Sequence, residues 1–157
     1  WFSVGDIYPL GCIFHTSNIY YEKNYHKLCS DYLEPKYNVH NLCYNGIYEK
    51  KCGFNNIEMT FSHDYYLSQS LLKSNTDLPY EAIYIIQYHS FYSWHTPRNK
   101  IRGYEDLADE TDWKYLPLLK LFQKFDLYSK HDSKELYVDY NYYDKLIEKY
   151  IPYSIYI

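Results

Sequence analysis

Three residues of types that bind metals fall on the apolar side or at the end of three different predicted helices: His63, His89 and Asp126. His63 lies four residues from both Met59 and Leu67, and residues four apart share one helix face. His89 follows apolar residues at similar intervals. Asp126 ends an aromatic-rich stretch, where an unpaired buried carboxylate would be costly. These features indicate a metal site, although hydrogen-bonded core histidines and a paired or capping aspartate would fit the same spacing.

Four helices are expected to position these ligands. They span Asn55 to Ser74, Asp77 to Thr96, Thr111 or Asp112 to about Asp126, and Asp139 to about Ile147. Apolar residues recur in them every three or four positions, and Asn, Asp and Thr at their starts are typical N-caps. No stretch alternates with period two over five residues, so the expected fold class is all-α. Residues 1–54 read as loop-rich, residues 55–152 carry the four helices, and residues 98–110 form a charged connection.

Composition restricts the class of protein. The 157 residues suit one domain, with 46% apolar and 23% charged residues. A net charge of -4 disfavours nucleic-acid binding. We see no membrane-spanning stretch and no signal peptide, which favours a cytoplasmic protein without membrane contact. The 24 tyrosines are consistent with codon bias and need not reflect function.

Four cysteines, Cys12, Cys29, Cys43 and Cys52, lack a Cys-x-x-Cys pair. Their spacing therefore indicates neither a zinc ribbon nor a redox motif. In a cytoplasmic protein of this size, reduced and buried thiols are expected, and paired cysteines in a secreted protein are the alternative.

Seven short strings occur in a fixed order along the chain. They are Val4–Cys12, Asn45–Tyr48, Cys52–Asn56, Ser62–Asp64, Tyr88–Tyr92, Trp94–His95 and Phe125–Lys130. Together they resemble the C-terminal part of the myo-inositol oxygenase family, from residue 1 to about residue 152. So many ordered matches are very improbable by chance.

This resemblance implies an HD-domain-like helical fold, incomplete at the N-terminus, that forms one portion of a single catalytic domain. It implies two iron ions, with O2 as the oxidant, and cleavage of the myo-inositol ring to D-glucuronate. By position, His63, His89 and Asp126 match three iron ligands. Imidazole and carboxylate ligands suit iron and leave coordination positions open. Asp64 follows His63 but matches no ligand, so a supporting or structural role is expected for it.

The same resemblance implies substrate-binding positions at Gly5, Asp6, Ser90 and Lys130. Asp6 would accept hydrogen bonds from sugar hydroxyls, and Ser90 would both donate and accept. Lys130 would also act in catalysis, as a cation near developing negative charge on oxygen. His95 is expected at the surface or beside the site.

Three further iron ligands of the family would precede Trp1. The 157-residue chain is therefore expected to be inactive alone, whereas the longer parent is expected to be an active monomer. Two alternatives remain open: a truncated or degenerate HD-fold protein without catalysis, and an HD-type phosphohydrolase. The second would need arginines directed at phosphate, and the sequence has only Arg98 and Arg102.

Overall fold

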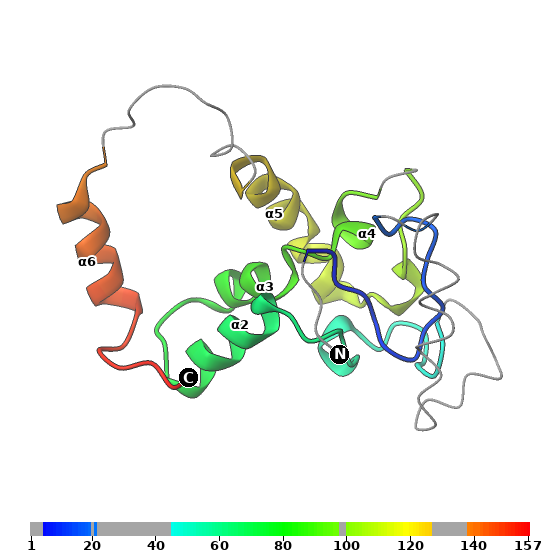
Figure 1. Cartoon of the computed structure of the whole chain (residues 1–157), viewed down its shortest axis with the longest axis horizontal. Helices are drawn as coiled ribbons and strands as arrows, with labels where there is room; N and C mark the ends of the chain where they lie inside the picture. Colours follow the sequence, from blue (N-terminus) through cyan, green and yellow to red (C-terminus); the bar gives the residue numbers. More distant parts are fainter. Residues whose placement is uncertain (1–4, 20, 22–44, 98–99, 127–137) are drawn as a thin grey trace.

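The computed structural model describes residues 5–19, 21, 45–97, 100–126 and 138–157, and the regular elements in these ranges are all helices joined by loops (Figure 1). Its elements are η2 (Phe54–Asn56), α2 (His63–Lys73), α3 (Tyr80–Tyr88), α4 (Tyr92–His95), η3 (Glu105–Leu107), α5 (Glu110–Asp126) and α6 (Tyr140–Tyr150), where η marks a 3-10 helix. These ranges contain no β-strand, although Pro9 and Met59 form an isolated antiparallel bridge. The predicted all-α class is confirmed.

Helix α3 occupies the centre, as its apolar composition predicts. It packs against α2 on one side and α5 on another, and α4 packs against α5. The side chains of Ile83, Tyr84 and Tyr88 are buried. Phe54 of η2 is also buried, and it meets the rings of Phe91 and Trp94 edge to face at centroid distances of 5.1 and 5.0 Å. Aromatic pairs in this arrangement stabilise a core beyond the area that they bury.

The first predicted helix was placed too early in the chain. Only η2 occurs near Asn55, and α2 begins at His63. Residues 58–60, which lie between these two helices, pair with residues 8–10: Leu10 N–H donates to Glu58 O at 2.7 Å, and Thr60 N–H donates to Tyr8 O at 3.0 Å. Backbone groups committed to a distant segment cannot form helical hydrogen bonds. The C-terminal end was predicted correctly, since Ser74 caps α2.

The second predicted helix is divided into α3 and α4. The N-cap of α3 is Pro79 and not the predicted Asp77. The backbone N–H of Asp77 instead donates to Tyr150 O at 3.0 Å. The helix ends at His89, and Phe91 has φ -82° and ψ 63°, outside the helical region. Apolar periodicity continues across this break, so it gives no sign of the turn that separates α3 from α4.

The charged connection before α5 also contributes apolar side chains to the core in its described part. Tyr104, Leu107 and Ala108 are buried in the core. Gly103 N–H donates to Ser93 O at 2.8 Å, which ties the segment to α4. The charged residues Glu105 and Asp106 face outward and obscure the apolar positions on either side of them.

Helices α5 and α6 begin close to their predicted positions. Helix α5 starts one or two residues earlier than predicted, at Glu110. Helix α6 starts after Asp139, whose Oδ1 accepts a hydrogen bond from Tyr142 N–H at 3.2 Å, as an N-cap residue should. No described helix is both long and apolar enough to cross a membrane. Cys52 is a free thiol, and Cys29 and Cys43 lie outside the described residues.

Candidate metal centre

Two imidazoles from different elements converge on one point. His63 is the first residue of α2, and His89 directly follows α3. Their Nε2 atoms are 3.2 Å apart, and their ring centroids are 5.1 Å apart with an interplanar angle of 77°. The packing of α2 against α3 therefore brings together two residues that are 26 positions apart in sequence.

The ends of the two helices fix these positions. Ser62 is the N-cap of α2, and its Oγ accepts a hydrogen bond from Tyr65 N–H at 3.5 Å. His63 is thus at the start of the helix and does not share a helix face with Met59, so the predicted burial of its ring is wrong: the side chain is 61% exposed. His89 is 16% exposed, as its apolar neighbours predict. The ring of Phe122 on α5 meets it edge to face at 5.7 Å.

The hydrogen bonding of His89 leaves Nε2 as the ring atom that can bind a metal. Its Nδ1 lies 2.9 Å from Ile86 O, a carbonyl that can only accept. Nδ1 must therefore carry the proton, and Nε2 has a lone pair. Metal-binding histidines typically donate a hydrogen bond from the ring nitrogen that does not bind the metal, as Nδ1 of His89 does here.

Asp64 joins the two histidines. Its side chain is fully buried, with Oδ1 2.9 Å from His63 Nε2 and Oδ2 3.5 Å from His89 Nδ1. Oδ2 accepts a hydrogen bond from Ser90 N–H at 3.0 Å, and Oδ1 accepts one from Ser90 Oγ at 3.1 Å. One carboxylate thus links the start of α2 to the turn after α3.

The geometry fits a metal ion with imidazole and carboxylate ligands. Ligand atoms of His63, Asp64 and His89 all lie within 4.8 Å of one another. Two Nε2 atoms that face each other can share only one proton, and a cation between them would satisfy both lone pairs. The nearby carboxylate would offset its charge. These donors suit iron, as the chemistry of the residue types predicts.

Asp126, the third predicted ligand, is the last residue of α5 and is not within this group of ligand atoms. Burial raises the pKa of Tyr92, a hydrogen bond with Gln123 lowers it, and the charges of Asp126, Asp6 and Asp64 raise it. Metal binding by Asp126 stays a prediction.

The predicted substrate-binding residues of the N-terminal segment lie beside the turn after α3. Ile7 N–H donates to Ser90 O at 3.1 Å, which places Asp6 close to this turn. Asp6 Oδ2 accepts a hydrogen bond from Ile19 N–H at 2.8 Å, while Oδ1 is buried and has no partner among the described residues. Burial raises the pKa of Asp6 to about 7. Gly5 has a φ of 98° with open space on its Cβ side.

His95 was expected at the surface or beside the site, and the structure places it beside the site and buried. It is 2% exposed, and its Nε2 lies 2.8 Å from the carbonyl oxygen of His89. Burial lowers the pKa of His95 to about 4, so the ring is neutral at physiological pH. Because that carbonyl can only accept, Nε2 carries the proton and supports the backbone of His89. Lys130 lies outside the described residues.

Fold and site define an all-α protein with a candidate metal centre at the junction of α2 and α3. The chain belongs to the myo-inositol oxygenase family, whose model matches residues 1–157. It is 45% identical over 154 residues to the inositol oxygenase of Dictyostelium discoideum, covering 97% of this chain and 49% of that protein.

Two further relatives give the same picture. Inositol oxygenase 2 of Arabidopsis thaliana is 41% identical over 156 residues, covering 97% of this chain and 45% of that protein. The inositol oxygenase of Homo sapiens is 35% identical over 153 residues, covering 97% of this chain and 50% of that protein. The chain thus spans about half the length of the curated relatives that it matches.

Proposed function

We propose that the full-length protein carrying this chain uses iron and O2 to cleave the ring of myo-inositol to D-glucuronate. The observation that supports this most is the convergence of His63 Nε2 and His89 Nε2 at 3.2 Å in a member of this family. The reaction is a four-electron oxidation in which one oxygen atom of O2 enters the product and the other leaves as water.

In this proposal, His63, His89 and Asp126 hold iron. When bound, iron would supply the redox chemistry for O2 and acidify a coordinated hydroxyl group. Asp6 would accept a hydrogen bond from a substrate hydroxyl through its unpartnered Oδ1. Gly5 and Ser90 would complete the contact with substrate, and Lys130 would provide the catalytic cation.

Several finer features belong to the same proposal. We propose two iron ions, with ligands in addition to those of this chain, in a monomeric cytoplasmic protein of HD-domain type. The net charge of -4 supports a function that involves neither nucleic acid nor membrane lipid.

The phosphohydrolase alternative receives no support from Arg102. Its guanidinium carbon lies 4.8 Å from the ring centroid of Trp94 and 5.5 Å from that of Trp113. The same guanidinium donates a hydrogen bond to Trp94 O. Arg102 therefore ties α4 to α5, and Arg98 lies outside the described residues.

The test is glucuronate formation by the full-length protein, supplied with myo-inositol, Fe(II) and cysteine under air. We expect His63→Ala and His89→Ala each to abolish turnover and lower the iron content, because each removes a proposed iron ligand. Thermal melting would show whether the variants still fold. A folded, iron-loaded wild-type protein that forms no glucuronate would refute the proposal and favour the non-catalytic alternative.

A further inference from the structure

Every hydrogen-bond donor of Ser90 is taken by one side chain. The backbone N–H of Ser90 donates to Asp64 Oδ2 at 3.0 Å, and the hydroxyl donates to Asp64 Oδ1 at 3.1 Å. A serine hydroxyl has one proton and two lone pairs, and an ionised carboxylate has no proton to give. The direction of the hydroxyl bond is therefore fixed, and Ser90 offers only acceptors to any other molecule.

We propose that Asp64 is a positioning residue that holds the Ser90 hydroxyl as a hydrogen-bond acceptor for a substrate hydroxyl. This deepens the proposed function and rests on it. It also corrects the expectation that Ser90 both donates and accepts. A ligand at Ser90 must bring a proton, as the hydroxyl of a neutral polyol does, whereas a fully ionised phosphate or carboxylate group has none.

Because both residues are buried, a ligand group that cannot donate to Ser90 Oγ would bind less favourably. Asp64 is fully buried, and Ser90 is 3% exposed. A buried acceptor that meets another acceptor loses its hydrogen bond to water without gaining a new one. Asp64 also lies 2.9 Å from His63 Nε2, so the Ser90 hydroxyl and the proposed metal ligand are held in one fixed relation.

Asp64→Asn tests the proposal because it keeps the shape and changes the direction of hydrogen bonding. The amide oxygen of Asn can still accept from Ser90 N–H, but its NH2 group would face Ser90 Oγ and turn the hydroxyl proton outward. In the proposal the substrate hydroxyl is oriented with its own proton towards Ser90 Oγ, so two protons would then oppose each other. We expect the Kd of the iron-loaded full-length protein for myo-inositol to rise about tenfold, as for the loss of one hydrogen bond to a neutral group.

Ser90→Ala provides the second arm of a double-mutant cycle. If Asp64 acts through Ser90, the double variant binds myo-inositol no more weakly than Ser90→Ala alone. Losses that multiply in the double variant, or a wild-type Kd in Asp64→Asn, would overturn the proposal. Iron content is measured in each variant, so that loss of metal is recognised separately.

Asp112→Asn is the matched control. Asp112 is equally buried, but its partners are Phe54 N–H, Asp109 N–H and the Tyr84 hydroxyl, away from the two histidines. We expect this variant to melt at a lower temperature and to keep the wild-type Kd for myo-inositol. An equal loss of affinity in both Asn variants would indicate a general structural effect and refute the specific role of Asp64.

Hydrogen exchange at the Ser90 amide tests the positioning role without substrate. Asp64→Ala removes the acceptor of this N–H, so its exchange should become at least about tenfold faster, whereas Asp64→Asn should stay near wild type. If wild-type protein fails to bind myo-inositol, the proposed function fails, and this exchange measurement still decides whether Asp64 holds Ser90. Unchanged exchange in Asp64→Ala would overturn the positioning role.

Discussion

At the scale of single residues, the buried carboxylates differ in how their charge is compensated. Asp112 accepts hydrogen bonds from two backbone N–H groups and from the Tyr84 hydroxyl at 2.8 Å. At Asp6, backbone hydrogen bonds from Ile19 and Tyr92 lower the pKa less than burial raises it, and Oδ1 is buried without a well-aligned partner among the described residues. The full set of partners at Asp112 is typical of a structural residue, and the unpartnered oxygen of Asp6 is typical of a residue that binds a ligand.

Asp112→Ala should lower the free energy of unfolding of the full-length protein by about 3 kcal/mol, because it leaves three buried donors without an acceptor. Tyr84→Phe, which removes only one of these hydrogen bonds, should cost about 1 kcal/mol. Urea denaturation followed by circular dichroism measures both values. Equal losses in the two variants would contradict the assignment of Asp112 as the shared acceptor.

Asp6 should make stability depend on pH. Its folded-state pKa of about 7 lies above the ordinary 3.8, because burial disfavours the charged form. The folded state therefore binds the proton more tightly, and stability falls as pH rises from about 4 to about 7. Asp6→Asn should remove this fall and be more stable than wild type by about 2 kcal/mol at pH 8. Parallel stability curves for the two proteins over this range would contradict the prediction.

Residues that act through tertiary contacts could not be predicted from sequence. The pairing of His63 with His89 was within reach, because the family resemblance named both residues. The role of Asp64 between them depends on the turn at residues 89–91, where Ser90 N–H and Oγ meet the carboxylate. Nothing in the periodicity of the sequence marks that turn. For His95 the sequence left a surface position and a position beside the site open, and only its hydrogen bond to the backbone carbonyl of His89 decides between them.

At the scale of elements, the sequence predicted a helix boundary correctly where a capping residue determines it. Asp139 and Ser74 bound α6 and α2 as predicted. The start of α2 was missed because residues 58–60 form backbone hydrogen bonds with the distant segment 8–10. Such pairing overrides a helical pattern of apolar residues and is not encoded within one window of sequence.

Gly46 should be essential to the packing of the loop elements. Its φ is 58°, and a Cβ there would overlap the carbonyl of Gly11, which accepts a hydrogen bond from Ile47 N–H at 3.2 Å. Gly46→Ala should therefore lower the free energy of unfolding by at least about 3 kcal/mol. Gly5→Ala is the control: its φ is also positive, but open space surrounds it, so strain alone costs about 1 kcal/mol. Equal effects in urea denaturation would show that the overlap is relieved cheaply.

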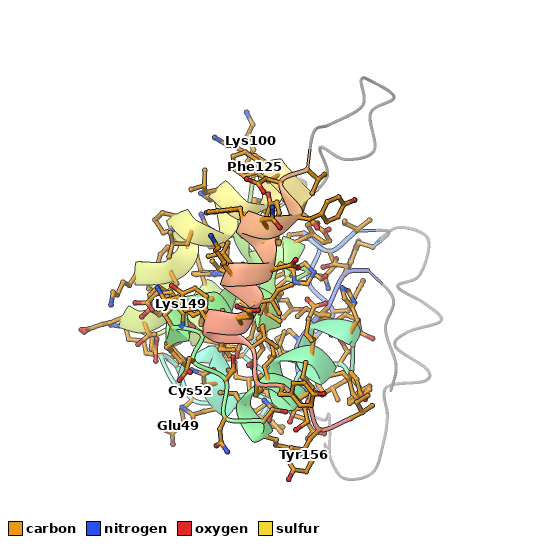
Figure 2. All side chains as sticks on the ribbon, turned by 90° about the vertical axis from the view of Figure 1, so that its left-hand side faces the viewer. Glu49, Cys52, Lys100, Phe125, Lys149 and Tyr156 are labelled. Carbon is orange, nitrogen blue, oxygen red and sulfur yellow. The ribbon has the colours of Figure 1, made fainter. Side chains whose placement is uncertain are left out.

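At the scale of the whole molecule, the described structure has a packed centre and a loosely attached helix. Figure 1 shows α6 apart from α2, α3 and α5, with the chain after it returning to the C-terminal end of α2. No residue of α6 is buried. Figure 2 shows Phe125 and Tyr156 at the edge of the molecule, and their side chains are 68% and 70% exposed.

The attachment of α6 relies on backbone hydrogen bonds at one end. Tyr150 O accepts from Thr76 Oγ1 at 2.7 Å and from Asp77 N–H at 3.0 Å, both in the loop between α2 and α3. Tyr156 N–H donates to Ser74 Oγ at 2.9 Å and holds the segment that follows. With so few contacts to the described part of the chain, α6 should open locally at a much lower free energy than α3.

Hydrogen exchange of the full-length protein should therefore show α6 amides exchanging at least about a hundredfold faster than those of α3. Thr76→Val removes one of the two bonds to Tyr150 O and should speed exchange in α6 further while leaving α3 unchanged. Ser74→Ala serves as the comparison, because it breaks the contact with Tyr156 beyond the helix. Exchange in wild-type α6 that is as slow as in α3 would mean that further contacts hold this helix. Unchanged exchange in Thr76→Val would refute the role of Thr76.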